Sequence, residues 1–498
     1  MERNWLDRAI GWVDPQAGFQ RARHRKALEV AFAYDAAKIG RQTSGWATSG
    51  TSANAEISAG AAKSRERARD LVRNNPIARN AKHQFASKLV GTAINPRAAT
   101  GKAALDKRLD ELWRVFDAEG NADGDTPLST KQIQWAGAMF ESGDVLLRRR
   151  PRLPSDGLRL NLQVQTLEID YLDTAHQNSG AGGYAIEGIE FDGVGRRSGY
   201  WIHAQHPGES AVLRGGTTQS KLIPAGDIAH LFEEDRPGQI RGMTRFAPVV
   251  RKLRSLDELA EAKLEGRKVE ACFSVFVRRN DAENGPLLGP ESTAADGKRI
   301  ESLEPGMIEY LRTDEDITFA DPKPSAGYVE ESRLWTHEVA AGLQMPYELL
   351  SGDLSQINYS SYRGSLLSFR DMIEAVRWNT FIPRALTVIW RWFVDACFIG
   401  GLIPEINYAV EWDPPAFDLL DRLEEAKADL AEMRSGTLTW PQAVGRKGYD
   451  PAKQALEISM GWKMLDALGI VLDCNPRDRT AQGNIPSGGG TQNAIATA

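Results

Sequence analysis

A chain of 498 residues is too long for a single compact core, and chains of this length divide into about two to four domains. Its hydrophobic content of 42% and charged content of 26% are ordinary for a globular protein. The net charge of −6 argues against a chain built mainly to grip nucleic acid, because such chains carry an excess of Lys and Arg.

The first 89 residues contain two predicted helices and a flexible segment. Residues 1–41 have a helical and basic pattern, whereas residues 42–62 are rich in Ser, Thr, Ala and Gly and predict a flexible surface segment. A second helix is expected from Ser64 to Leu89. Pro76 lies inside it, so we expect a break near Asn74–Asn75.

Between residues 128 and 232 the pattern is mainly that of strands, after one helix at Lys131–Glu141. Short apolar runs separated by Gly and Pro favour β-structure; they occupy 144–150, 160–168 and 184–192, and the series continues through YWIHAQHP and DIAHLFEE. This pattern predicts an α+β domain with a mixed or antiparallel sheet.

The middle of the chain follows a helix, β-insert, helix pattern. Apolar residues recur at three- and four-residue steps from Thr244 to Ala271, with charges of both signs between them, and predict a long amphipathic helix. Short strands are expected at 272–279 and 307–312, on either side of a Gly/Pro/Asp-rich stretch. A second helix is expected from Val329 to Leu343.

The C-terminal third is predominantly helical. A long helix is predicted from Tyr362 to Phe398, with one interruption at Pro383. A charged helix follows at 418–436, where Gly436 occupies a C-cap position, and another is expected near Ala452–Leu468. The low-complexity end, from Asn475 onward, predicts disorder.

No catalytic or metal-binding constellation stands out. His203 and His206 lie three residues apart, a spacing that does not place two strand side chains on one face, and Asp314, Glu315 and Asp316 have no matching His or Cys. The chain lacks a GxxxxGK[ST] or GxSxG motif. We therefore expect no enzyme activity, no cofactor and no metal site.

Composition also indicates the compartment. Cys272, Cys397 and Cys474 are odd in number and far apart, so they predict neither a disulfide framework nor a CxxC metal pair, and a reducing compartment is expected. No stretch reaches the roughly 18 apolar residues of a membrane span, and the N-terminus has no signal-peptide core. These features predict a soluble intracellular protein.

Two residue groups favour a structural interpretation over a functional one. The cluster Arg148, Arg149, Arg150 and Arg152 ends a predicted strand and is expected in a solvated turn, with contact to phosphate or an acidic partner as the alternative. The aromatic residues of the long helix fall on more than one face and are expected to be buried; they are Trp378, Phe381, Trp390, Trp392 and Phe393.

The segment Ser351–Ser361 lies between two predicted helices and consists mainly of Ser, Gly, Asp, Gln, Asn and Tyr. Such residues hydrogen-bond locally to the backbone and resist continuing a helix. Composition alone leaves two interpretations open. The segment is either a plain connector or a mobile loop that presents polar groups to a ligand or channel.

Several stretches, in order along the chain, resemble lambda-like phage portal proteins. Residues 68–96 (ARDLVRNNPIARNAKHQFASKLVGTAINP) resemble an N-terminal helix signature, and 186–209 resemble a sheet segment of that family. Residues 223–250 (IPAGDIAHLFEEDRPGQIRGMTRFAPVV) and 440–451 are also similar. The block 338–370, which contains LLSGDLSQINYSSYRGSLLSFR, resembles the family's LSGD and NYSS motif.

The resemblance implies an α+β portal-type subunit with an α/β wing, a helical stem, a small β-containing clip and a helical crown, which assembles into a ring, usually a dodecamer. The implied division is an N-terminal basic and flexible segment (1–63), wing (64–242), stem helix (243–271), clip (272–326), stem helix (327–344), tunnel loop (345–361), long kinked helix with wing closure (362–414), crown (415–468) and disordered tail (469–498).

The resemblance also implies partners and DNA-contacting residues. The ring would occupy the unique capsid vertex of the virion, after assembly in the host cytoplasm, and let double-stranded DNA pass during packaging and ejection. Partners would be the terminase large subunit, the major capsid and scaffolding proteins, and head-completion or tail adaptor proteins. Residues expected to contact DNA are Ser355, Gln356, Asn358, Tyr359, Ser360 and Arg363.

Two other classes of protein compete with this interpretation. A different head–tail connector or minor capsid protein is the first, although such chains are typically shorter and do not need a β-insert between two helices. A nuclease or motor subunit is the second, and it requires a carboxylate cluster for metal or a P-loop.

Overall fold

The computed structural model describes most of the chain between residues 50 and 472. The described residues are 12–17, 20, 41, 44–46, 50–177, 183–209, 219–271, 275–278, 308–311, 327–415, 417, 422–449, 451–470 and 472. The chain forms two compact units, Met1–Glu56 and Ile57–Ala498. In the first unit, Asp14 Oδ1 accepts hydrogen bonds from the backbone N–H groups of Gln16 and Ala17.

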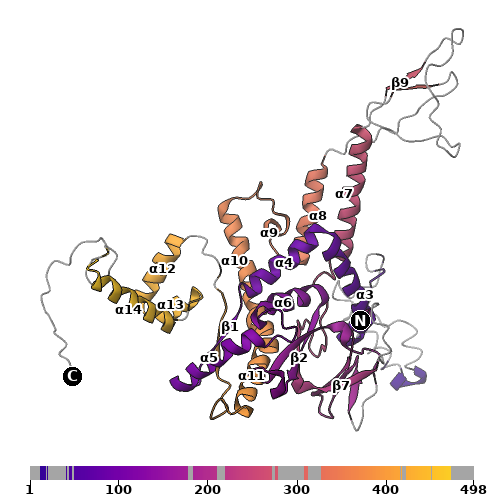
Figure 1. Cartoon of the computed structure of the whole chain (residues 1–498). Coiled ribbons are helices and arrows are strands. Elements are labelled where there is room, and N and C mark those ends of the chain that lie inside the picture. The colour runs from indigo at the N-terminus through magenta and orange to yellow at the C-terminus, as the bar shows by residue number, and fades with distance from the viewer. Residues whose placement is uncertain are drawn as a thin grey trace, which may run out of the picture. The chain divides into compact units, whose positions relative to one another are not determined.

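Two helices follow each other between residues 53 and 90. Helix α3 spans Ala53–Asn74 and α4 spans Pro76–Val90 (Figure 1). The predicted break at Asn74–Asn75 is confirmed, because Pro76 is the first residue of α4 and the Asn75 side chain accepts from the Ala78 N–H at 2.8 Å. Residues 53–62 are helical rather than flexible, since their alanines favour a helix.

The strands of residues 144–232 form two antiparallel sheets, so the expected α+β class and the antiparallel alternative are confirmed. One sheet has the order β3-β2-β8 and the other β4-β5-β6-β7. The strands are β2 (Asp144–Pro151), β3 (Leu162–Glu168), β4 (Tyr184–Ile186), β5 (Ile189–Phe191), β6 (Arg197–His203), β7 (Ser220–Pro224) and β8 (Ile228–Phe232). A separate antiparallel pair joins β1 (Asn95–Ala98) to β11 (Val410–Asp413).

The apolar run 184–192 is a hairpin rather than one strand. Its turn residues Glu187 and Gly188 have φ values of 49° and 77°, as a two-residue hairpin turn of type I′ requires. Glycine adopts this conformation freely, whereas Glu187 is one of two non-glycine residues with positive φ among the described residues. Its side chain is nonetheless buried and ion-paired with Arg241.

Helices α5 (Ala103–Glu119) and α6 (Lys131–Ser142) contribute to the main core. The helix predicted at Lys131–Glu141 is confirmed, because α6 spans these residues. The core contains an aromatic cluster in which the ring centroids of Trp113 and Phe393 lie 5.1 Å apart and those of Phe116 and Phe393 lie 5.4 Å apart. Such pairs each add about 1 kcal/mol beyond the area they bury.

A pair of helices carries the chain away from this core and back. Helix α7 spans Val250–Ala271 and α8 spans Tyr328–Gly342, and the two run side by side in Figure 1. Lys252 and Glu338 form an ion pair between them. The observed helix starts at Val250, six residues after the predicted start at Thr244, because residues 245–249 form turns. Between the helices, β9 (Val275–Arg278) pairs in parallel with β10 (Ile308–Leu311), and the remaining insert, with Asp314–Asp316, lies outside the described residues.

The long C-terminal helix is continuous through Pro383, so the predicted interruption is wrong. Helix α10 (Tyr359–Val376) passes through a π-helical segment, η7 (Arg377–Leu386), into α11 (Thr387–Ile399). The wider turns of the π-helix accommodate the proline. Their five-residue spacing is seen where the Thr387 N–H bonds to the Ile382 carbonyl. Phe381, Trp390, Trp392 and Phe393 are buried as predicted, whereas Trp378 is 46% exposed.

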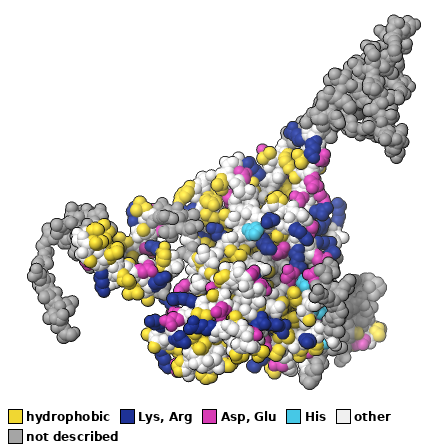
Figure 2. Space-filling view, viewed as in Figure 1, with side chains coloured by type: hydrophobic (Ala, Val, Ile, Leu, Met, Phe, Trp, Pro, Cys, Tyr) yellow, Lys and Arg dark blue, Asp and Glu magenta, His cyan; other side chains and the backbone are white. Residues whose placement is uncertain are grey.

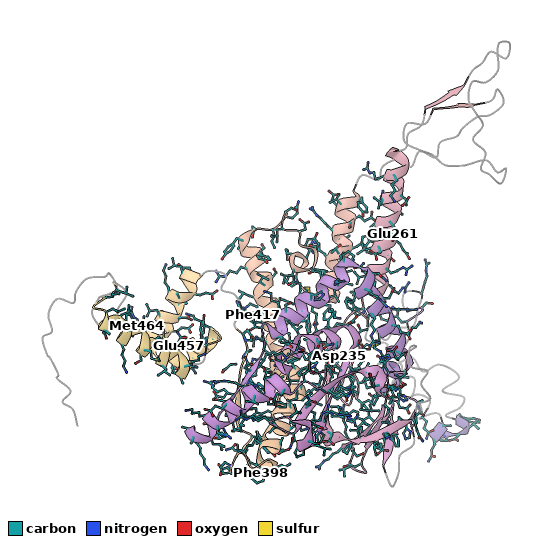
Figure 3. The ribbon with its side chains drawn as sticks, in the orientation of Figure 1. Asp235, Glu261, Phe398, Phe417, Glu457 and Met464 are labelled. Carbon is teal, nitrogen blue, oxygen red and sulfur yellow. The ribbon has the colours of Figure 1, made fainter. Side chains whose placement is uncertain are left out.

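Arg377, at the start of η7, is buried although it is charged. Its guanidinium donates to the carbonyls of Leu89 and Lys88 at the end of α4, and pairs with Glu374. The carbonyls at a helix C-terminus have no intrahelical donor, so Arg377 caps α4. Phe417, labelled in Figure 3, packs 5.0 Å below the Arg377 guanidinium.

Three short helices follow: α12 (Arg422–Ser435), α13 (Trp440–Arg446) and α14 (Pro451–Ala467). Gly436 has a φ of 79°, which confirms the predicted C-cap. Helix α14 has no buried residue, and Met464, labelled in Figure 3, is 61% exposed. Yellow hydrophobic side chains cover part of this region in Figure 2. The tail beyond residue 472 lies outside the described residues.

A buried group of charges joins the two sheets to the segment that leads into α7. Asp144 Oδ1 accepts from His230 Nε2 at 3.1 Å and from the Gly242 N–H at 2.6 Å, and its Oδ2 accepts from Arg241 at 3.2 Å. Arg241 also pairs with Glu187 at 3.0 Å. The half-buried Arg197 contacts His230 Nδ1 at 3.4 Å. We call Asp144, Glu187, Arg197, His230 and Arg241 the buried charge network.

No helix among the described residues is long and apolar enough to cross a membrane.

Candidate functional site

The polar segment between α8 and α10 is held at its base by a short helix. Helix α9 spans Tyr347–Ser351, and the Asn80 side chain of α4 donates to the carbonyls of Leu349 and Leu350 at 2.8 and 2.9 Å. Gly352 ends α9 with a φ of 73°, a backbone conformation that glycine adopts without strain. The backbone beyond Gly352 therefore starts from a fixed point.

Asp353 is the centre of the hydrogen bonds within this segment. Its Oδ1 accepts from the backbone N–H and the hydroxyl of Ser355, at 3.0 and 2.7 Å. Its Oδ2 accepts from Arg333 Nε and from the Tyr347 hydroxyl, both at 3.1 Å. The Ser355 hydroxyl in turn receives a bond from the Arg333 guanidinium at 3.0 Å.

These bonds favour the ionised carboxylate, so they lower the pKa of Asp353 to about 2. The largest cause is the hydroxyl of Ser355, followed by its backbone N–H. The carboxylate therefore stays charged across the physiological pH range. Its charge is balanced by the Arg333 guanidinium, which lies 3.1 Å from Oδ2.

The sequence predicted six DNA-contacting residues, and three of them belong to the loop Gly352–Asn358. Ser355 is held by Asp353, as described above. Gln356 is exposed, and its side chain makes no hydrogen bond to any described residue. Asn358 is the N-cap of α10, where its Oδ1 accepts from the Ser361 N–H at 2.8 Å.

The other three predicted residues lie in the first two turns of α10 rather than in the loop. Tyr359 is 60% exposed, and the Ser360 hydroxyl donates to Asn358 Oδ1 at 2.8 Å. Arg363 is half-buried. The structure thus brings all six residues onto one loop and the helix start that follows it. We call residues 352–363 the loop–helix site.

Sequence reasoning missed the residues that hold this site. Arg333 comes from α8, Tyr347 from α9 and Asn80 from α4, far apart in the sequence. A polar segment after a helix gave no signal for the partner of Asp353, because an ion pair between elements depends on tertiary packing.

The candidate histidines His203 and His206 lie beside different carboxylates. Glu168, Asp170 and His206 lie with their ligand atoms within 4.8 Å of one another. Arg69, however, donates to Glu168 at 2.8 Å and to Asp170 at 2.7 Å, so a guanidinium already balances these carboxylates. His203 lies 3.9 Å from Asp173 instead.

The predicted solvated turn at Arg148–Arg152 is wrong for three of its arginines. Arg148, Arg149 and Arg150 lie within β2, are half-buried and are paired with β3. Burial lowers the pKa of Arg148, with Arg150 as a smaller cause. Arg152 follows the strand and donates to Gln163 at 2.8 Å.

Loss of the Arg333 contact is expected to loosen the loop without unfolding the protein. In Arg333→Gln, amide hydrogen exchange at 353–358 should rise several-fold, because Asp353 loses its cationic partner while the half-exposed pair contributes little to global stability. Glu330→Gln, an exposed position on the same helix, is the matched control. Equal exchange in both variants at neutral pH contradicts a tethering role for Arg333.

Comparison with known proteins identifies the family to which this chain belongs. Residues 39–377 match the family model described as phage portal protein, lambda family. This match spans well over half of the chain and includes the loop–helix site. The chain therefore belongs to the lambda family of phage portal proteins, and it is a structural component of the virion at the capsid portal rather than an enzyme.

Individual relatives are distant. The chain is 24% identical to the probable portal protein of Halomonas phage phiHAP-1 over 84% of this chain and 83% of the relative. It is 22% identical to portal protein B of Escherichia phage lambda, over 66% of this chain and 67% of the relative. Among solved structures, a chain from the neck of an empty gene transfer agent particle is 15% identical, with a TM-score of 0.41, over 79% of this chain and 95% of that chain.

Proposed function

We propose that this portal protein assembles into a closed ring, usually of twelve subunits, whose axial channel passes double-stranded DNA. Membership of the portal family supports a ring at the capsid vertex. Such a ring needs head-to-tail contacts that close by rotation, and the mixed-charge helix α7 offers a surface for them. The DNA would be driven by a separate terminase, and head-completion or tail proteins would dock on the same ring.

The parts of the subunit follow from this proposal. Residues 64–242 form the wing, 243–271 and 327–344 the stem, 272–326 the clip, 345–361 the tunnel loop, 362–414 the long helix with wing closure, and 415–468 the crown. The side-by-side packing of α7 and α8 supports the stem, and the exposed helix α14 supports a crown that contacts other copies or partners. Most of the clip lies outside the described residues.

The loop–helix site is proposed to touch the moving DNA lightly. The observation that carries this role is the ion pair of Asp353 with Arg333, which balances the one charged side chain of residues 352–360. A cation that bound phosphate would release counterions and add affinity that stalls sliding, whereas a free carboxylate would repel the duplex. Polar groups such as Gln356 avoid both effects.

Electron microscopy of the purified full-length chain tests the ring. We expect particles with a central hole and rotational symmetry resolvable in averaged views. Monomers, or shells without a hole, contradict the proposed assembly and favour a different connector or minor capsid role.

DNA packaging tests the loop. In a triple variant, Gln356→Ala, Asn358→Ser and Tyr359→Ala, packaging by the cognate motor is expected to fall well below that of the wild type, because the polar contact surface is removed. Serine at position 358 retains an N-cap. Gln356→Arg should also slow packaging, most strongly at low salt. Wild-type packaging by the triple variant, with intact rings, excludes the tunnel-loop role.

A further inference from the structure

A basic pocket lies where α3 meets α4, on elements separate from the loop–helix site. Figure 1 shows these two helices joined at their break, with α6 beside α4. The pocket has a volume of about 380 Å³. We call it the basic pocket, and the residues that line it are Arg69, Val72, Arg73, Arg79, Lys82, His83 and Glu141.

Helical periodicity explains why these side chains converge. Arg69 and Arg73 are four residues apart on α3 and share a face. Arg79, Lys82 and His83 are three and four residues apart and share a face of α4. The break at Pro76 lets the two faces meet around one cavity, although the chain as a whole carries a net charge of −6.

Part of this charge is already balanced within the chain. Arg69 pairs with Glu168 and Asp170, and Lys82 pairs with Glu141. In contrast, the side chains of Arg73, Arg79 and His83 are exposed and have no hydrogen bond or ion pair with any described residue. Two guanidinium groups and an imidazole therefore remain available at one cavity.

The two free guanidinium groups differ in how they suit their helices. Arg73 lies in the last turn of α3, where the helix dipole favours a cation. Arg79 lies in the first turn of α4, where the dipole disfavours a cation and no acidic residue is present. An anion bound beside Arg79 would offset this unfavourable interaction.

We propose that the basic pocket binds phosphate, with Arg73 and Arg79 as its principal ligands. A guanidinium presents two parallel N–H donors, a geometry that matches two phosphate oxygens. The phosphate source that fits best is the DNA backbone, and this choice of source rests on the proposed DNA-handling function. Free inorganic phosphate offers the guanidinium groups the same oxygen acceptors, so an experiment is needed to separate the two sources.

The test measures binding of full-length protein to a short fluorescent duplex by anisotropy, from about 50 to about 200 mM salt. In the double variant Arg73→Gln and Arg79→Gln, affinity at low salt should fall at least tenfold. The slope of log K against log salt should become shallower by about 2, because each lost cation removes roughly one released counterion.

Arg67→Gln is the matched control, since Arg67 is exposed on α3 but does not line the pocket. We expect it to change affinity less than twofold. An equal loss in the control and the double variant, or a double variant that binds like the wild type, overturns the DNA assignment. So does a wild type that does not bind DNA at low salt.

Competition separates the sources of phosphate. Displacement of the duplex by inorganic phosphate, beyond the effect of chloride at matched ionic strength, supports phosphate as the recognised group. Phosphate binding that depends on Arg73 and Arg79, measured by calorimetry without any DNA binding, retains the pocket and overturns DNA as its source. If the double variant weakens the binding of poly-glutamate but not that of DNA or inorganic phosphate, both phosphate sources are overturned and an acidic protein partner is indicated.

Electron microscopy of the same variants keeps this inference separate from the proposed ring. Double-variant rings of normal symmetry with weakened DNA binding support the pocket. If the wild-type protein forms no ring, the assembly proposal is contradicted. DNA binding that still depends on Arg73 and Arg79 would nevertheless support the basic pocket.

Discussion

Asp144→Asn is expected to lower the free energy of unfolding by roughly 3 kcal/mol. The wild-type carboxylate is fully buried and accepts three hydrogen bonds, from His230, Arg241 and the Gly242 backbone. Burial acts to raise the pKa of Asp144, but the Arg241 charge and the bonds from His230 and Gly242 together lower this pKa below its ordinary value. Removal of the negative charge leaves Arg241 buried with one carboxylate, Glu187.

Denaturant unfolding of the full chain, followed by tryptophan fluorescence, measures this loss as a lower midpoint of the transition. Asp235→Asn is the matched control, because Asp235 is exposed and lies in the segment between β8 and Arg241 (Figure 3). We expect the control to remain within about 0.5 kcal/mol of the wild type. A midpoint for Asp144→Asn equal to that of the control contradicts a stabilising role for the network.

His230→Gln is expected to remove most of the pH dependence of stability between about pH 4 and pH 6.5. Burial lowers the pKa of His230 from 6.5 to about 4, against the opposing effect of Asp144. Arg197 has no acceptor atom, so the contact of its guanidinium with Nδ1 at 3.4 Å requires an unprotonated Nδ1. The proton of the neutral ring then lies on Nε2, which donates to Asp144.

The surroundings of His230 explain why a second proton is disfavoured. Asp144 and Glu187 balance Arg241 and Arg197, so the neutral imidazole completes a network without net charge. Tyr200 and Phe232 pack against the ring, with centroids 5.7 and 4.6 Å away, and Arg384 lies over Phe232. Protonation would therefore place an unbalanced positive charge in a buried site.

The sign of the pH effect follows from proton linkage. Between pH 4 and pH 6.5 the unfolded chain binds a proton at position 230 and the folded chain does not. Stability from this residue is thus complete above pH 6.5 and decreases as the pH falls toward 4, by on the order of 3 kcal/mol in total. Glutamine can still donate to Asp144 but does not titrate.

Urea midpoints of wild type and His230→Gln at intervals from pH 4 to pH 8 provide the measurement. We expect the two curves to converge at the acidic end, with the variant less sensitive throughout the window. Exposed His83, replaced by Gln, is the control and should keep the wild-type slope. Parallel curves for wild type and His230→Gln would show that another group causes the acid loss.

Features governed by local chain chemistry were predictable from sequence. The helix at Lys131–Ser142, the break at Pro76 and the C-cap at Gly436 all match, because helix propensity, capping and proline sterics act within a few residues. Pro383 is the exception. A proline usually breaks a helix, but packing of the buried residues around it maintains a π-helical path.

The loop–helix site shows the same division. Its position between two helices, its polar composition and its family resemblance were evident in the sequence, and the six residues do lie together. Their role in contacting DNA stays a prediction. The balance of Asp353 by Arg333, on which the proposal depends, could not be predicted, because twenty residues and a reversal of chain direction separate the pair.

The sequence by itself determined the α+β class, most helix positions, the polar segment around Gln356 and the portal family. Only the tertiary structure decided the 184–191 hairpin, the buried charge network and the convergence of Arg73 with Arg79 on one cavity. The physical reason is the range of the interactions. Propensity and capping depend on neighbours along the chain, whereas ion pairs, burial and pockets depend on which distant segments pack together.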